Sequence, residues 1–237
     1  MKLFIDLLRP LIVITATIPV NILIFMGILV STVFQKRLLR YRLAQYSAKL
    51  LLFLSGIKIV KIQKFSDESS SSAYYLGNFL GIELLPALIS IIKEPTCLIL
   101  RWFNFFTPIF GWAFILLRFI PFSNKYSKFS KLLKSRMQIE GYSVVNFPAG
   151  YNILHKTDSK SLFKSISLKP FDSKLKIIPF ATIETEIRDS FWYRSCFMIS
   201  FMPPVYLNNN ISKINQITYI EKIVRTELEN LTEHLGA

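Results

Sequence analysis

The stretch YYLGNFLGIELL, residues 74–85, is where a predicted strand leads into a predicted helix, and it decides the fold class. Its first half is apolar and aromatic, as is typical of a buried strand. From Gly81 the residues continue at helical spacing, and Pro86 lies early enough to be tolerated in the first helical turn. The junction is therefore predicted at Asn78 and Phe79, and the question it raises is whether a group there can move a proton.

Strands and helices are predicted to alternate along the rest of the chain. Residues 56–65 alternate apolar and basic side chains, which favours a half-buried strand with its lysines in water. Further strands are predicted at 142–150, 174–183 and 196–207, and helices at 123–141, closed by Gly141, and at 210–235. This alternation predicts an α/β domain with a mostly parallel sheet flanked by helices.

The run 96–122 is apolar enough to be mistaken for a membrane span. It is longer than one span, and polar residues interrupt it at Arg101, Asn104 and Arg118. We therefore interpret it as a short strand, a turn at Pro108 and a helix that carries Gly111.

An N-terminal membrane span is predicted at residues 11–34, which contain no charged side chain. A helix of this length crosses a hydrocarbon core of roughly 30 Å. The run is too long for the apolar part of a signal peptide and is not followed by a small-residue cleavage site. Its C-terminal flank is richer in basic residues than its N-terminal one, which predicts that the following domain lies on the cytoplasmic side.

Residues 38–56 continue at helical spacing with cationic and apolar side chains mixed. This pattern suits a helix in the membrane interface, and it equally suits an amphipathic helix packed on the domain. The expected organisation is a membrane anchor with an interfacial helix at 1–55, followed by an α/β domain at 56–237.

The composition points to a lipid partner. The chain of 237 residues is 51% hydrophobic, with a mean hydropathy of +0.39, and carries a formal net charge of +14. Beside a membrane span, this charge favours anionic phospholipid over nucleic acid, for which no binding signature is visible. Cys97 and Cys196 lack metal-ligand spacing, so free buried thiols in a reducing compartment are predicted.

The order of these segments resembles the lysophospholipid acyltransferase family, of the 1-acylglycerol-3-phosphate acyltransferase-like type, over nearly the whole chain. The first block of that family reads N-H-x-S-x-x-D, the second P-x-x-G followed by an arginine, and the third F-P-E-G-T-R. The resemblance implies a histidine that takes the proton from the acceptor hydroxyl, an aspartate that orients it, and arginines that hold the acceptor phosphate. It also implies that residues 56–237 form an acyltransferase-like domain.

This chain departs from the family at the positions that carry the chemistry. Asn78 is kept, but Phe79 stands at the histidine position and Leu84 at the aspartate position. Neither side chain can accept a proton. In the third block Ala149 replaces the glutamate. The positions that the resemblance assigns to substrate binding are Asn78, Asn124, Lys125, Phe147, Pro148, Gly150 and Asn152.

Three residues are candidates for a relocated catalyst. Glu83 is next to the lost aspartate position, but one residue along a helix is a rotation of about 100°, so it is expected to point away from the site. A first-turn carboxylate that favours the helix dipole is its simpler role. His155 has Asp158 close by, although a solvated loop histidine is the simpler interpretation.

The sequence therefore predicts a membrane-anchored, acyltransferase-like protein of lipid metabolism that binds lipid or a protein partner without catalysis. No cofactor or metal is expected. The alternative is an active acyltransferase that uses relocated groups and an acyl thioester donor on a lysophospholipid or another amphipathic acceptor. A basic membrane protein that recruits nucleic acid is a third hypothesis, supported by the net charge alone.

Overall fold

The computed structural model describes most of the α/β domain and part of the N-terminal segment. The described residues are 15, 22, 25–34, 36–64, 72–78, 80–81, 83–106, 110–122, 126–147, 175–187, 190, 192–206 and 213–236.

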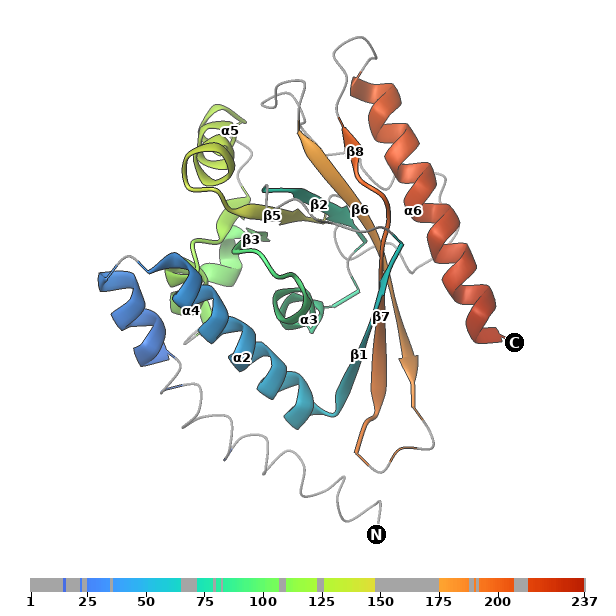
Figure 1. The fold of residues 1–237 in the computed structure, drawn as a ribbon, viewed down its shortest axis with the longest axis horizontal. Coiled ribbons are helices and arrows are strands. Elements are labelled where there is room, and N and C mark those ends of the chain that lie inside the picture. The colour runs from blue at the N-terminus through green and yellow to red at the C-terminus, as the bar shows by residue number, and fades with distance from the viewer. Residues whose placement is uncertain are drawn as a thin grey trace.

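One eight-stranded sheet organises the domain (Figure 1). Its strands are β1 (Ile57–Gln63), β2 (Tyr74–Gly77), β3 (Thr96–Arg101), β4 (Ile120–Phe122), β5 (Ser143–Asn146), β6 (Lys176–Glu186), β7 (Ser195–Phe201) and β8 (Val205–Tyr206). They follow the order β1-β7-β6-β2-β5-β3-β4, with β8 paired to β6. Only the β6–β7 and β6–β8 pairs in this described sheet are antiparallel, so the predicted mostly parallel sheet is confirmed.

Helices cover both faces of the sheet, because alternate strand residues point to opposite sides. They are α2 (Arg37–Ser55), α3 (Leu84–Ile91), η1 (Trp102–Phe106), α4 (Phe110–Leu116), α5 (Tyr126–Lys134), η2 (Ser135–Ile139) and α6 (Lys213–Gly236). Tyr75 joins the apolar cluster that includes residues of α2 and α3, whereas Tyr74 and Leu76 join the cluster that includes residues of α5 and α6. The domain therefore has three layers, with α2 and α3 across the sheet from α6 (Figure 1).

The N-terminal segment is described only in part. Residues 25–34 are mainly helical, and half of the predicted span at 11–34 lies outside the described residues. In the part of the chain that the structure describes, no helix is both long and apolar enough to cross a membrane.

The amphipathic helix predicted at 38–56 is confirmed as α2, and one of its faces packs on the domain. Tyr41, Ala48 and Leu52 are buried in the cluster that includes α3. The Tyr41 hydroxyl donates to the carbonyl of Ile92 at 3.2 Å. The other face exposes Leu38, Leu39, Tyr46 and Phe53. One face of α2 therefore packs on the domain, and the other face is exposed and could contact a membrane or another surface.

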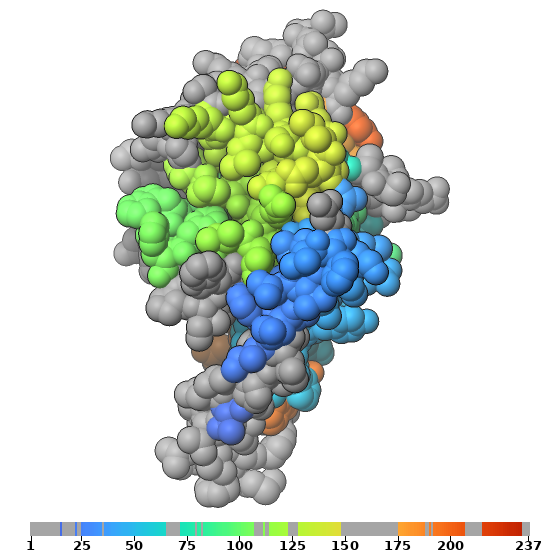
Figure 2. Space-filling view, turned by 90° about the vertical axis from the view of Figure 1, so that its left-hand side faces the viewer, coloured from blue at the N-terminus to red at the C-terminus, as the bar shows by residue number. Residues whose placement is uncertain are grey.

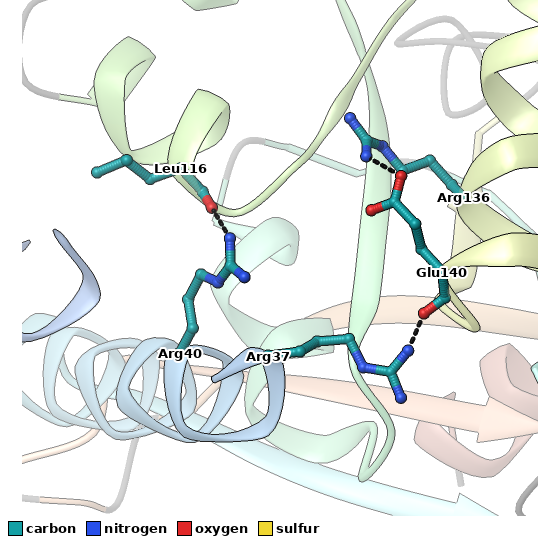
Figure 3. A network of polar contacts seen from close by, with 5 residues as sticks. All are labelled: Arg37, Arg40, Leu116, Arg136 and Glu140. Carbon is teal, nitrogen blue, oxygen red and sulfur yellow. Dashed lines mark hydrogen bonds and ion pairs between the residues drawn. The ribbon is translucent and has the colours of Figure 1, made fainter. Parts of the chain in front are cut away.

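Two arginines tie the start of α2 to the ends of other helices (Figure 3). Arg40 is buried and donates from Nη1 to the carbonyl of Leu116, the last residue of α4, at 3.1 Å. Arg37 donates to the carbonyl of Glu140, just after η2, and the Glu140 carboxylate forms an ion pair with Arg136. Cations at helix C-termini are favourable because carbonyl groups there lack helical partners. These contacts fix the orientation of the start of α2 relative to the rest of the domain.

The run 96–122 is more finely divided than expected. The predicted strand is β3 and the predicted helix is α4, which carries Gly111, whereas the turn predicted at Pro108 lies outside the described residues. The sequence reading missed η1 and the three-residue strand β4, because both lie inside one apolar run without periodicity. Gly141 has the positive φ of 64° that suits a residue closing a helix, as predicted.

Helix α6 is held to the sheet by a buried carboxylate. Glu227 accepts hydrogen bonds from the Ser200 hydroxyl and from the Lys64 ammonium, both at 2.7 Å. Burial acts to raise the pKa of Glu227, but the hydrogen bonds from Lys64 and Ser200 outweigh it, and the net pKa is below the usual 4.5. A carboxyl whose pKa is lowered by folding stabilises the protein above its unfolded-state pKa and loses that contribution as the pH falls.

We expect Glu227→Gln to lower the free energy of unfolding at neutral pH by about 1–2 kcal/mol, since a charge-assisted contact is lost while Lys64 is partly exposed. Urea unfolding at several pH values measures this difference. It should narrow as the pH falls below about 4.5. The control is Glu229→Gln, an exposed carboxylate on the same helix, and a Glu227→Gln difference that does not change with pH would contradict the argument.

Candidate functional site

The carboxyl ends of β2, β3 and β5 meet at one edge of the sheet, because these strands are parallel neighbours. Asn78 and Phe147 directly follow β2 and β5, and the pairing of Leu76 with Asn146 brings them close together. In open α/β sheets this edge is where ligands bind. We call it the carboxyl edge, and it contains the described positions that the family resemblance singles out.

Asn78 is a structural residue. It is 2% exposed, and its Nδ2 donates to the Thr182 carbonyl at 2.7 Å while its Oδ1 accepts from the Thr182 amide at 2.8 Å. The Thr182 hydroxyl also donates to Oδ1, at 3.1 Å. The β2–β6 pairing ends with Gly77 opposite Phe180, so the Asn78 side chain continues that ladder by one more pair of bonds. These bonds occupy the amide that the resemblance assigned to substrate binding.

Leu84 lies where the family resemblance expects the orienting aspartate. It is the first residue of α3, is fully buried and belongs to the apolar cluster between the sheet and α2. A carboxylate in this position would be surrounded by hydrocarbon. Leu84 therefore contributes to packing in this position.

Glu83 is exposed immediately before α3 and makes no capping hydrogen bond to that helix. Its carboxylate folds back over Gly81, where a Cβ would lie 2.7 Å from Oε2. Neighbouring Leu84 is buried, so the two side chains have opposite environments, as the helical rotation predicts. Glu83 sits at the positive end of α3, which agrees with the simpler role expected for it.

Aromatic rings pack beneath the described part of the carboxyl edge. The Phe147 and Phe180 rings meet edge to face with centroids 6.0 Å apart, and the centroid of the Phe201 ring is also 6.0 Å from that of Phe180. Gly77 permits this arrangement, since a Cβ there would overlap both the carbonyl and the ring of Phe180. Glycine inside a strand indicates a close backbone approach, so Gly77 is the sequence feature that could have revealed this contact. No local signal identifies Phe180, Phe201 or Thr182 as neighbours of this edge.

Two titratable groups near the amino ends of β2 and β3, Tyr74 and Cys97, are buried and stay protonated at neutral pH. Burial raises the pKa of the Cys97 thiol to about 12. Burial also raises the pKa of Tyr74, whose hydroxyl accepts from Asn146 Nδ2 at 2.8 Å. Cys97 and Cys196 are buried and unpaired with each other, as predicted. Within the described ranges, no group of three or more His, Cys, Asp or Glu residues is placed to hold a metal ion.

The remaining candidates lie outside the described residues: Phe79, Asn124, Lys125, Pro148, Gly150, Asn152, His155 and Asp158. Their roles stay predictions. A positive charge is nonetheless present among the described residues of the edge, where Arg101 ends β3 and is exposed.

Comparison with known proteins identifies the fold. No family model matches the chain, and no curated protein matches it in sequence. Among solved structures, the chain is similar to the 1-acyl-sn-glycerophosphate (LPA) acyltransferase PlsC from Thermotoga maritima, with a TM-score of 0.73 and 16% identity. The match covers 98% of each chain. The chain therefore has the α/β fold of this acyltransferase, as the order of its segments implied.

We expect Asn78→Ala to lower the free energy of unfolding by about 2–4 kcal/mol, because it leaves the buried amide and carbonyl of Thr182 without partners. Thermal and urea unfolding of the purified domain measure the loss. The matched control is Asn146→Ala, at the end of the adjacent strand, which gives up one bond to Tyr74 and should cost about 1 kcal/mol. Equal losses for the two variants would contradict the special role of Asn78.

Proposed function

We propose that the protein is a membrane-anchored, acyltransferase-like protein of lipid metabolism that binds phospholipid, or a protein partner, without transferring an acyl group. The observation that carries this proposal is the state of the carboxyl edge. The strand end that would support a catalytic histidine is held by Asn78 and Thr182, while the aspartate position is Leu84, buried in hydrocarbon. The fold of the site is therefore kept, whereas the residues at the histidine and aspartate positions cannot transfer a proton.

The chemistry of the edge suits an amphipathic lipid. Phe147, which is partly buried, offers an apolar contact for an acyl chain, and the exposed Arg101 offers a charge for a phosphate group. Further cations on α5, among them the exposed Lys128 and Lys131, strengthen the preference for an anionic headgroup. The name of the similar structure, an acyltransferase of a glycerophosphate lipid, supports the same class of ligand.

Membrane attachment is proposed from the sequence. Residues 11–34 would form the single span, and the basic flank from Lys36 onward would keep the α/β domain on the cytoplasmic side. Arg37 and Arg40 are engaged with the domain, so they would also orient it relative to the membrane surface.

The alternative is an active acyltransferase with relocated groups. Glu83 favours it to a limited degree, because its carboxylate is exposed at the start of α3 and makes no capping bond to that helix. His155 with Asp158 is the other candidate pair. Without a positioned base, acyl transfer from a thioester to an alcohol would lose a factor of roughly 10²–10⁴.

Acyl transfer to lysophosphatidic acid by the detergent-purified full chain tests the proposal. We expect no product above the protein-free control with an acyl-CoA donor. Two further variants, His155→Ala and Glu83→Gln, should leave this background unchanged. Turnover by the native protein that either variant abolishes would establish the alternative.

A restoration experiment uses Phe79→His with Leu84→Asp. Because Leu84 is fully buried, its carboxylate replacement is expected to destabilise the core by several kcal/mol, so thermal unfolding must accompany the assay. Leu84→Ala, which removes the same packing without adding charge, is the control for stability. A folded double variant that turns over where the native chain does not would support the assignment of these two positions.

A further inference from the structure

We infer that η1 is a second membrane contact, which seats the carboxyl edge on the surface of a bilayer that contains anionic phospholipid. The inference rests on the proposed membrane attachment and extends it to a surface more than sixty residues along the chain from the predicted span. We call the three exposed side chains of η1, Trp102, Phe103 and Phe106, the aromatic ridge.

The aromatic ridge exposes an unusual amount of apolar surface. Trp102 is 63% exposed, Phe103 49% and Phe106 75%. The Trp102 and Phe106 rings meet edge to face with centroids 5.5 Å apart, so they form one surface rather than separate side chains. Single exposed apolar residues are ordinary, whereas a contiguous group of large ones marks an interaction site.

Helix η1, which carries the ridge, is anchored to the core of the domain through Phe105. Phe105, between its members in sequence, points the other way and packs against the core cluster, with its ring centroid 6.1 Å from that of Phe114 on α4. Helix α4 approaches the backbone of η1 so closely that a Cβ at Gly111 would overlap the Phe105 carbonyl group. Gly111 is therefore required for the support of the ridge, a role that the sequence did not reveal.

Charge around the ridge favours a lipid bilayer over an apolar protein surface. Arg101 directly precedes the ridge and is exposed. Strand β4 contacts η1 and α5, and α5 exposes Lys128 and Lys131. Aromatic side chains with neighbouring cations are the composition of membrane-interface surfaces, because the rings sit at headgroup depth and the cations meet lipid phosphates.

Helix η1 and the N-terminal helices lie on the same side of the molecule (Figure 2). In that view η1 is green, at the left, and the helical residues 25–34 and the start of α2 are blue. The exposed side chains on these helices are Met26, Leu29, Val30, Val33, Phe34, Leu38 and Leu39. A bilayer placed on this face would contact both groups, which would bring the carboxyl edge next to the lipid that it is proposed to bind.

Tryptophan quenching by brominated lipid tests the inference on the full-length chain. The double variant Trp112→Phe/Trp192→Phe leaves Trp102 as the single fluorescent reporter. The protein is placed in vesicles of phosphatidylcholine and phosphatidylglycerol whose acyl chains are brominated near the headgroup end. A positive control carries Phe34→Trp, and a negative control carries Tyr219→Trp on α6, each with all three native tryptophans replaced by Phe. Tyr219 is 58% exposed, close to the value of Trp102, and α6 packs on the other face of the sheet.

We expect Trp102 fluorescence to fall at least about twofold in brominated vesicles, as for the reporter at position 34, while the reporter at position 219 is unchanged. Omitting phosphatidylglycerol should weaken the effect on Trp102, and an equal effect without it would overturn the role of charge. Quenching at position 34 but not at Trp102 would overturn the inference and leave membrane attachment intact; the ridge would then serve a protein partner. Absence of quenching at both positions would refute the attachment itself.

Discussion

The pairing of Asn78 with Thr182 is the interaction on which the carboxyl edge depends. Strand β2 ends at Gly77, and the chain must leave the sheet there to enter α3. Both amide atoms of the Asn78 side chain bond to the backbone of a residue 104 positions away, so the departure point is fixed relative to β6. Beside it, the missing Cβ of Gly77 lets Phe180 lie against that residue, and the Phe180 ring contacts that of Phe147. The carboxyl edge thus keeps its shape with the apolar Leu84 at the position where the resemblance expects an aspartate.

The second constraint is the direction of α2. Its packing on α3 buries one face, and Arg37 and Arg40 bind carbonyls at the ends of η2 and α4. The helix cannot turn about its axis without breaking these contacts, so its exposed face and the preceding residues 25–34 keep a fixed relation to the domain. A membrane at that face would meet the domain in one orientation.

Much of the fold could be predicted from the sequence because its signals are local. Residues 56–65 alternate in polarity, α2 has helical spacing, and Gly141 ends a helix with the positive φ expected of it. Strand β4 and the helix η1 could not be found in this way, because each is short and lies in a mostly apolar run that shows no periodicity. The order of the segments along the chain predicted the acyltransferase fold, and the similarity to a solved acyltransferase structure supports it. The two sequences are only 16% identical, so the likeness rests on the structure and not on matching residues.

The candidate site was less accessible to sequence reasoning. The resemblance located Asn78, Leu84 and Phe147, but it assigned Asn78 to substrate, whereas the structure shows its amide bonded to Thr182. That role depends on a contact between distant segments, and nothing near Asn78 in the chain encodes it. The helical rotation predicted that Glu83 points away from the site, and the structure gives Glu83 and Leu84 opposite environments.

We propose that this acyltransferase-like fold holds lipid without changing it. Native mass spectrometry of the full-length protein, purified in mild detergent and then incubated with an acyl thioester, tests it most directly. We expect a population of protein that carries one phospholipid, and the mass of this lipid should be the same before and after the incubation. Protein that retains no lipid, or a bound lysophospholipid that gains the mass of an acyl group, would contradict it.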